Sequence, residues 1–187
     1  IAHYATAEEK VKAEKCYLSL AKQLLDKENH KFQYKEVEHG GRAQKYFSSI
    51  EWLLRADMVH LCKRVTDIRF DLDDYARDDF FRAYTTDLSL LMAMKGGIFE
   101  CAVADALYKK GYPLYFYKNE TTKKEIDIII QKDGKVIPIE VKSGNTRANS
   151  LKSIMKNNKD ISFGYKFIDG NIGASKEGII TLPLYMV

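Results

Sequence analysis

Residues 125–142 read EIDIIIQKDGKVIPIEVK and contain two apolar runs, 126–130 and 136–141, in a pattern that predicts two strands. Two runs of mostly β-branched residues flank an Asp133-Gly134 step. Such a step is a strong hairpin signal, because glycine accepts the positive φ that tight hairpin turns need. The hairpin would point Glu125 and Asp127 to one face of the sheet and Ile126, Ile128 and Ile130 to the other.

A period near 3.6 predicts helices in four other places, because apolar residues recur there every three or four positions. The expected helices span residues 7–28, 42–56 and 98–110, and a fourth begins at 145 or 146. The expected strands span residues 32–37, 59–66, 113–118, 163–168 and 178–186, and Pro183 favours an edge or terminal position for the last one. The acidic, aromatic stretch 67–84 is interpreted as a connecting segment, and Asp87 as the N-cap of a following helix.

This order of elements predicts an α/β (α+β) fold. Residues 1–84 would form a helical, winged-helix-like region, because helices followed by a short pair of strands match that module. Residues 85–187 would form a mixed sheet flanked by helices.

The composition says more about where the chain is expected to be found than about which reaction it could catalyse. The formal net charge of +4 permits contact with nucleic acid without requiring it. Three widely spaced cysteines favour reduced thiols, and no apolar run reaches the about 20 residues of a membrane helix. We therefore expect a soluble, cytoplasmic chain with no membrane partner. The phosphate-binding pattern GxxxxGK[ST] is not found in the sequence, so no ATP site is expected in it.

Acids and a lysine stand together on the predicted hairpin. Asp127 lies on its first strand, and Glu140 and Lys142 share one face of its second. Carboxylates grouped in this way suit a hard divalent cation beside a phosphate or a water. An ordinary half-exposed hairpin would show the same alternation, so both readings stay open.

The same residues carry a resemblance to a known fold. Asp127, then Glu140-Val141-Lys142 on the next strand and an acid on a preceding helix, resemble the PD-(D/E)xK nuclease-like core, although Glu-Ile-Asp replaces the Pro-Asp of its name. More narrowly, the chain from about residue 30 to its end resembles the uncharacterised C-terminal domain that follows the ATPase domain of prokaryotic AAA-type ATPases. The resemblance implies a restriction-endonuclease-like mixed sheet over residues 85–187. It also implies an ATPase domain upstream, in line with a chain that begins at Ile1 instead of methionine.

The resemblance implies a role for each site residue. Asp127 and Glu140 would bind Mg²⁺ or Mn²⁺, with the Val141 carbonyl as a third ligand. Lys142 would orient a water or neutralise charge on a phosphate, and Glu100 would complete the site. Glu100 is equally explained as a favourable acid in the first turn of its helix. Glu125 is an outlying candidate, because it shares a face with Asp127.

Basic residues on two predicted helices are candidates for nucleic-acid contact: Arg42, Lys45, Arg147 and Lys152. They are also explained as a solvated helix face. Two rivals to a nuclease therefore stay open: a non-catalytic module that regulates the ATPase or docks a protein partner, and a winged-helix DNA-binding regulator. Family members carry a longer connection before the helix at residue 98, so we expect residues to be missing between Met94 and Lys95.

Overall fold

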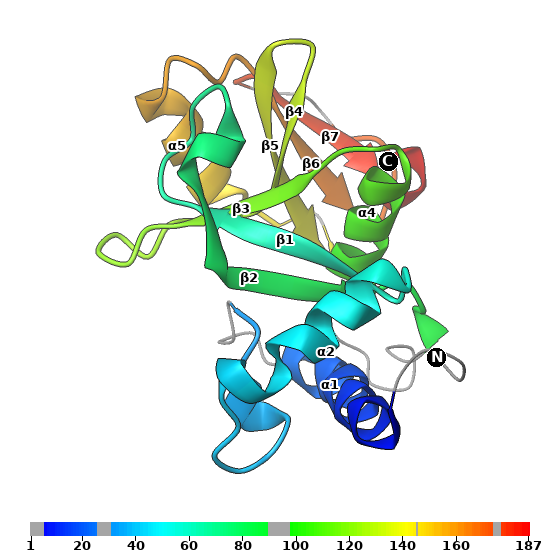
Figure 1. The fold of residues 1–187 in the computed structure, drawn as a ribbon. Helices are drawn as coiled ribbons and strands as arrows, with labels where there is room; N and C mark the ends of the chain where they lie inside the picture. Colours follow the sequence, from blue (N-terminus) through cyan, green and yellow to red (C-terminus); the bar gives the residue numbers. More distant parts are fainter. Residues whose placement is uncertain (1–5, 26–30, 90–97, 145, 174–176) are drawn as a thin grey trace.

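The computed structural model describes residues 6–25, 31–89, 98–144, 146–173 and 177–187 (Figure 1). Its centre is a seven-stranded mixed sheet in the order β2-β1-β3-β4-β5-β6-β7. The strands are β1 (Val59–Val65), β2 (Ala76–Thr85), β3 (Leu114–Lys118), β4 (Glu125–Lys132), β5 (Lys135–Lys142), β6 (Gly164–Ile168) and β7 (Ile179–Pro183). The sheet and its helices confirm the α/β (α+β) class.

Four α-helices are described around this sheet: α1 (Ala7–Leu25), α2 (Ala43–Arg55), α4 (Ile98–Lys109) and α5 (Asn149–Asn157). Helix α4 packs in one hydrophobic cluster with Ile128, Ile130, Ile137 and Ile139 of the hairpin. Helix α5 packs in a second cluster with Ile126 and Ile129, so α4 and α5 lie on opposite sides of the sheet (Figure 1). Helices α1 and α2 form a third cluster against β1 and β2.

The predicted hairpin is confirmed. Strands β4 and β5 pair antiparallel, with Lys132 opposite Lys135 across the turn. Asp133 and Gly134 have φ values of 50° and 72°, the left-handed conformation that a two-residue hairpin turn requires. The last strand, β7, is at the edge of the sheet, as Pro183 predicted.

Two local predictions were wrong. Residues 32–37 are not a strand: Tyr34–Glu36 form a 3-10 helix, and within this described stretch only the Phe32 N–H bonds the edge strand β2, at the Phe81 carbonyl, where the Phe32 side chain is buried at 6% exposure. The stretch 67–84 is more than a connection, since it contains the 3-10 helix Leu72–Tyr75 and most of the ten-residue strand β2. Of the acids that suggested a loop, Asp73 and Asp74 lie in the 3-10 helix, while Asp78 and Asp79 lie at the exposed start of β2, and the buried residues of the strand follow them.

The expected faces of β4 were wrong in part, because the strand contains a bulge. Tyr115 of β3 pairs with Ile129, whereas Tyr117 pairs with Ile126, so β4 carries one extra residue in this interval. The alternation of side chains therefore breaks beside Asp127. Ile126 joins the cluster on the α5 side, while Ile128 joins the one on the α4 side.

The sheet also runs across the predicted boundary between residues 84 and 85. Strand β1 pairs antiparallel with β2 and parallel with β3, so strands of both predicted regions belong to one sheet. The winged-helix-like character of residues 1–84 stays a prediction. The Asp87 carboxylate accepts a hydrogen bond from the Ser89 N–H at 3.0 Å, the contact expected of an N-cap, while the Met94–Lys95 step lies outside the described residues.

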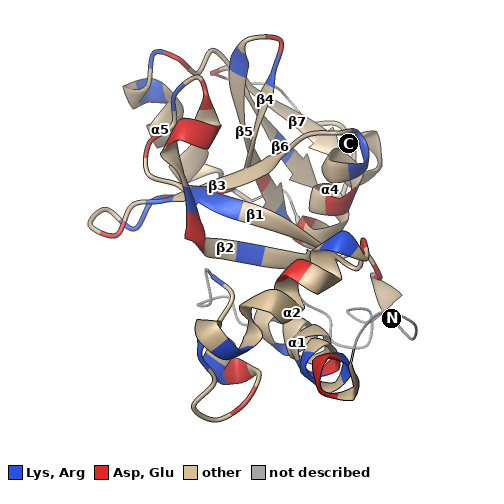
Figure 2. Ribbon diagram, viewed as in Figure 1, with Lys and Arg blue, Asp and Glu red and all other residues tan. Residues whose placement is uncertain are grey.

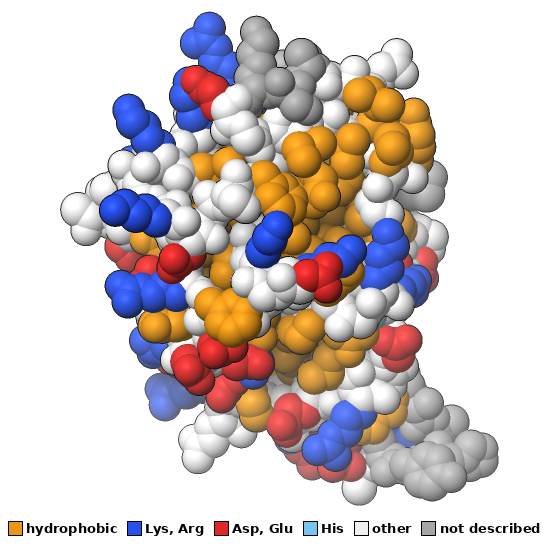
Figure 3. All heavy atoms as spheres, turned by 90° about the horizontal axis from the view of Figure 1, so that it is seen from above, with side chains coloured by type: hydrophobic (Ala, Val, Ile, Leu, Met, Phe, Trp, Pro, Cys, Tyr) orange, Lys and Arg blue, Asp and Glu red, His pale blue; other side chains and the backbone are white. Residues whose placement is uncertain are grey.

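Exposed hydrophobic side chains are present at several points of the surface, including Val11, Leu18, Ile172 and Tyr185. In the view from above, hydrophobic atoms reach the surface between charged side chains (Figure 3). Cys16, Cys62 and Cys101 are all buried and free. Within the described part of the chain, we find no helix that is both long and apolar enough to cross a membrane.

Candidate active site

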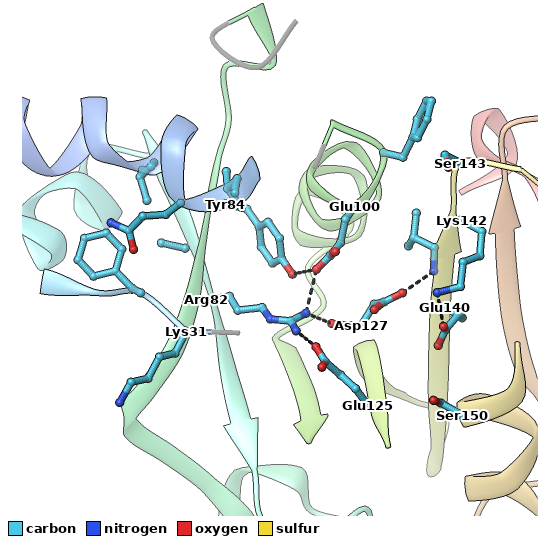
Figure 4. Close-up of a pocket in the computed structure, with 17 residues that line it drawn as sticks. Lys31, Arg82, Tyr84, Glu100, Glu125, Asp127, Glu140, Lys142, Ser143 and Ser150 are labelled. Carbon is cyan, nitrogen blue, oxygen red and sulfur yellow. Dashed lines mark hydrogen bonds and ion pairs between the residues drawn. The ribbon is translucent and has the colours of Figure 1, made fainter. Parts of the chain in front are cut away.

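Acids from three elements meet in one cavity of about 480 Å³. Glu100 comes from the first turn of α4, Glu125 and Asp127 from the start of β4, and Glu140 from the end of β5 (Figure 4). Lys142 lies beside Glu140 on β5. The structure thus brings together Glu100, Asp127, Glu140 and Lys142, along with Val141 and the outlying candidate Glu125.

Asp127 is partly buried, and its carboxylate is tied to the neighbouring strand. Its Oδ2 accepts a hydrogen bond from the Val141 N–H at 2.8 Å, which ties β4 to β5 just beyond their last paired residues. Burial, followed by the charges of Glu100 and Glu140, raises the pKa of Asp127 far above its usual range. A cation at this point would relieve that repulsion.

Glu140 has one oxygen that is satisfied and one that is not. Its Oε1 lies 2.5 Å from the Lys142 Nζ, and its buried Oε2 has no hydrogen-bond partner. Burial, with the charge of Glu100, outweighs the effect of Lys142 and raises the pKa of Glu140. Burial alone would favour the neutral Lys142 amine, but the negative charges of Asp127 and Glu140 raise the pKa of Lys142 and keep it protonated.

Strand β2 supplies two site residues that the sequence did not reveal. Arg82 donates from Nη1 to Glu100 Oε1 at 2.9 Å and to the Asp127 carbonyl at 3.3 Å, and it pairs through Nη2 with Glu125. The Tyr84 hydroxyl donates to the same oxygen of Glu100. Their only signal was the FFRAYT pattern after the acidic run, in which a lone arginine stands between apolar residues.

The carboxylates of the pocket could hold a hard cation only with a small number of protein ligands. Among the described residues, no group of three or more His, Cys, Asp or Glu side chains is arranged to hold a metal ion. Asp127 and Glu140 both line the cavity, and the buried Oε2 of Glu140 has no hydrogen-bond partner. Mg²⁺ accepts one or two carboxylates and keeps several waters, so Asp127 and Glu140 are sufficient in number and in type. The Val141 carbonyl stays a predicted ligand; its N–H bonds Asp127.

The four basic candidates do not form one surface. Arg42 and Lys45 lie at the start of α2, whereas Arg147 and Lys152 lie just before and on α5, well away from α2 (Figure 1). Lys45 pairs with Glu38 at 2.5 Å and Lys152 with Glu177 at 2.6 Å. Acidic and basic residues are interspersed along α1 and α2 (Figure 2). Nucleic-acid contact by these residues stays a prediction.

The fold and the site together define an α+β protein with a carboxylate-lined pocket shared by both halves of the chain. Residues 1–98, just over half of the chain, match the family model of a domain of unknown function, DUF8612, and the chain belongs to that family. Residues 95–186 match a second domain of unknown function, DUF4143, which is common in proteins associated with AAA-type ATPases. No curated protein and no solved structure matches the chain.

These matches bear on the expected resemblance. The likeness to an uncharacterised domain associated with AAA-type ATPases is confirmed. It covers residues 95–186, instead of beginning near residue 30. Neither matching model describes a nuclease, so the PD-(D/E)xK assignment stays a prediction.

Proposed function

We propose that the pocket is a metal-dependent phosphodiesterase site of the PD-(D/E)xK nuclease type, which acts on nucleic acid. The observation that carries this proposal is the convergence of Asp127 and Glu140 with Lys142, where one buried oxygen of Glu140 has no partner. Burial, and after it the nearby acidic charges, raise the pKa values of Asp127 and Glu140, and strongly shifted pKa values in a pocket are typical of functional sites.

In this proposal Asp127 and Glu140 would hold Mg²⁺ or Mn²⁺, with the Val141 carbonyl as a third ligand. The ion would act as a Lewis acid on the phosphate and on a bound water. Water adds its oxygen to phosphorus, the P–O bond to the leaving group breaks, and the leaving oxygen takes a proton. Protonated Lys142 offsets the negative charge that develops on the phosphate. Glu100 lies at the edge of this group, where Arg82 and Tyr84 hold its carboxylate.

A second candidate is a non-catalytic module that regulates an ATPase or docks a protein partner. It is favoured by the ion pairs already present in the pocket. Lys142 bonds Glu140, and Arg82 pairs with both Glu100 and Glu125. A closed network of this kind can persist in a nuclease-like fold that has lost its activity, since fold does not fix function.

Nucleic-acid binding by the basic residues belongs to the same proposal. Several Lys and Arg side chains project along the side of the molecule on which α5 lies (Figure 3). Arg147 is exposed there, just before α5. Contact of Arg42 and Lys45 with DNA through a winged-helix-like region is a third reading. The link to an ATPase domain and a cytoplasmic location are proposals as well.

The test is a cleavage assay on single-stranded DNA, duplex DNA and RNA with Mg²⁺ or Mn²⁺. Asp127→Asn and Glu140→Gln keep side-chain size and remove one charge each, so both should abolish cleavage. Asp160→Asn is the matched control, because Asp160 is exposed and outside the pocket. Cleavage that survives both pocket variants would place the activity elsewhere. No cleavage, together with no Mn²⁺ binding by the folded chain, would favour the docking module.

A further inference from the structure

The net formal charge of the side chains around the pocket is equal and opposite to that of a single divalent ion. The carboxylates of Glu100, Glu125, Asp127 and Glu140 face two cationic side chains, those of Arg82 and Lys142. With all four carboxylates ionised, as they would be around a bound cation, the formal charge of this group is −2. Lys31 also borders the cavity, but its side chain points away from the carboxylates (Figure 4).

Arg82 is held firmly between the carboxylates farthest from Lys142. Its side chain is 10% exposed, and one nitrogen serves both Glu100 and the Asp127 carbonyl while the other pairs with Glu125. The guanidinium also lies over the Phe116 ring, with Cζ at 4.4 Å from the ring centroid. The planar guanidinium of arginine can bind two carboxylates and lie over an aromatic ring at the same time, whereas the ammonium group of lysine cannot.

We infer that Arg82 limits this site to one divalent ion, because it neutralises Glu100 and Glu125, the two carboxylates that a second ion would need. The inference rests on the proposed metal site. Two-metal hydrolases hold their ions about 3.5–4 Å apart and share carboxylates between them. Here Asp127 and Glu140 remain to bind one ion, and the Arg82 guanidinium supplies the positive charge that a second ion would otherwise supply. Arg82 is thus a positioning residue for Glu100 and Glu125, supplied by β2 from the segment that matches the first family model.

The number of bound ions tests the inference without reference to activity. The full chain is titrated with Mn²⁺ by calorimetry, and electron paramagnetic resonance detects magnetic coupling between neighbouring ions. The parent chain should bind one uncoupled Mn²⁺. No binding would remove the proposed metal site itself, whereas two ions per parent chain would overturn the role of Arg82 and leave the metal site in place.

Variants of Arg82 give the converse test. Arg82→Met has a similar length and no charge, so it should bind two coupled Mn²⁺ ions. A count of one in Arg82→Met would overturn the inference, because a merely structural arginine does not set the number of ions. Loss of a buried charge partner is destabilising. Arg82→Gln, which keeps a donor for Glu100, therefore serves as a second neutral variant with the same expected count of two.

Discussion

Replacing Asp127 by asparagine should make the metal-free protein more stable at neutral pH. The side chain is partly buried in the pocket, and this desolvation, followed by the charges of Glu100 and Glu140, opposes its ionisation. Asparagine has the same shape, and its carbonyl oxygen can still accept the hydrogen bond from the Val141 N–H. The substitution thus removes a charge that the fold tolerates poorly and keeps the contact that it uses.

The magnitude follows from the pKa of Asp127. Burial and the two neighbouring carboxylates raise it to about 8, against about 3.9 in an unfolded chain. Between these values the folded state binds more protons than the unfolded state, so the free energy of unfolding falls as pH rises, by about 1.4 kcal/mol per unit. From about pH 4 to pH 7 this amounts to up to about 4 kcal/mol, which Asp127→Asn should recover.

Urea unfolding between pH 4 and pH 8, with EDTA present, measures the effect. The difference in unfolding free energy between Asp127→Asn and the parent should be near zero at pH 4 and should grow steadily toward pH 8. Asp160→Asn, at an exposed position, should show no such trend. A variant that is less stable than the parent at pH 7, or a difference that does not change with pH, would refute the reasoning. Added Mn²⁺ should stabilise the parent and not the variant, since an ion that binds only the folded state adds to its stability.

Three further predictions concern the fold. Ile139→Ala should lower the free energy of unfolding by about 2–5 kcal/mol, because Ile139 is fully buried, while Ile172→Ala at an exposed position should change it by less than about 0.5 kcal/mol; urea unfolding distinguishes these. Gly134→Ala should cost about 1–2 kcal/mol in the same assay, because φ is +72° there and the added Cβ would meet no atom closer than 4.0 Å, so an unchanged midpoint would contradict the turn geometry. Burial raises the pKa of Cys16 and of Cys101 to about 12, so both thiols should resist a thiol reagent at pH 8 until urea unfolds the chain; rapid labelling of the folded protein would be the contrary result.

Much of the fold could be predicted from local pattern. The hairpin of β4 and β5 follows from β-branched runs around Asp133-Gly134, whose positive φ values are a local property of those two residues. Helices α2 and α4 follow from apolar residues at helical spacing, and the edge position of β7 follows from Pro183. In each case the deciding physics lies within a few neighbouring residues.

The composition of the pocket depended partly on the same pattern. Asp127 and Glu140 were found because they lie on one hairpin, and Lys142 because it follows Glu140 by two positions. Glu100 joined them through the resemblance to a nuclease-like core. All of them border the same cavity, although their roles remain proposals.

Other features were decided only when the whole chain had folded. Strand β2 looked like a loop, because its acidic start is exposed and only its pairing with β1 makes it a strand. The bulge in β4 depends on its register with β3, which no local pattern records, and it changes the direction of the side chains beside Asp127. Arg82 lies 43 residues before Glu125 in the sequence, and their ion pair exists because the sheet order brings β2 and β4 to the same pocket. Sequence alone thus encodes periods, turns and the hairpin acids, whereas tertiary pairing selects which distant charge faces them, since a Coulomb contact depends on distance in space and not on separation along the chain.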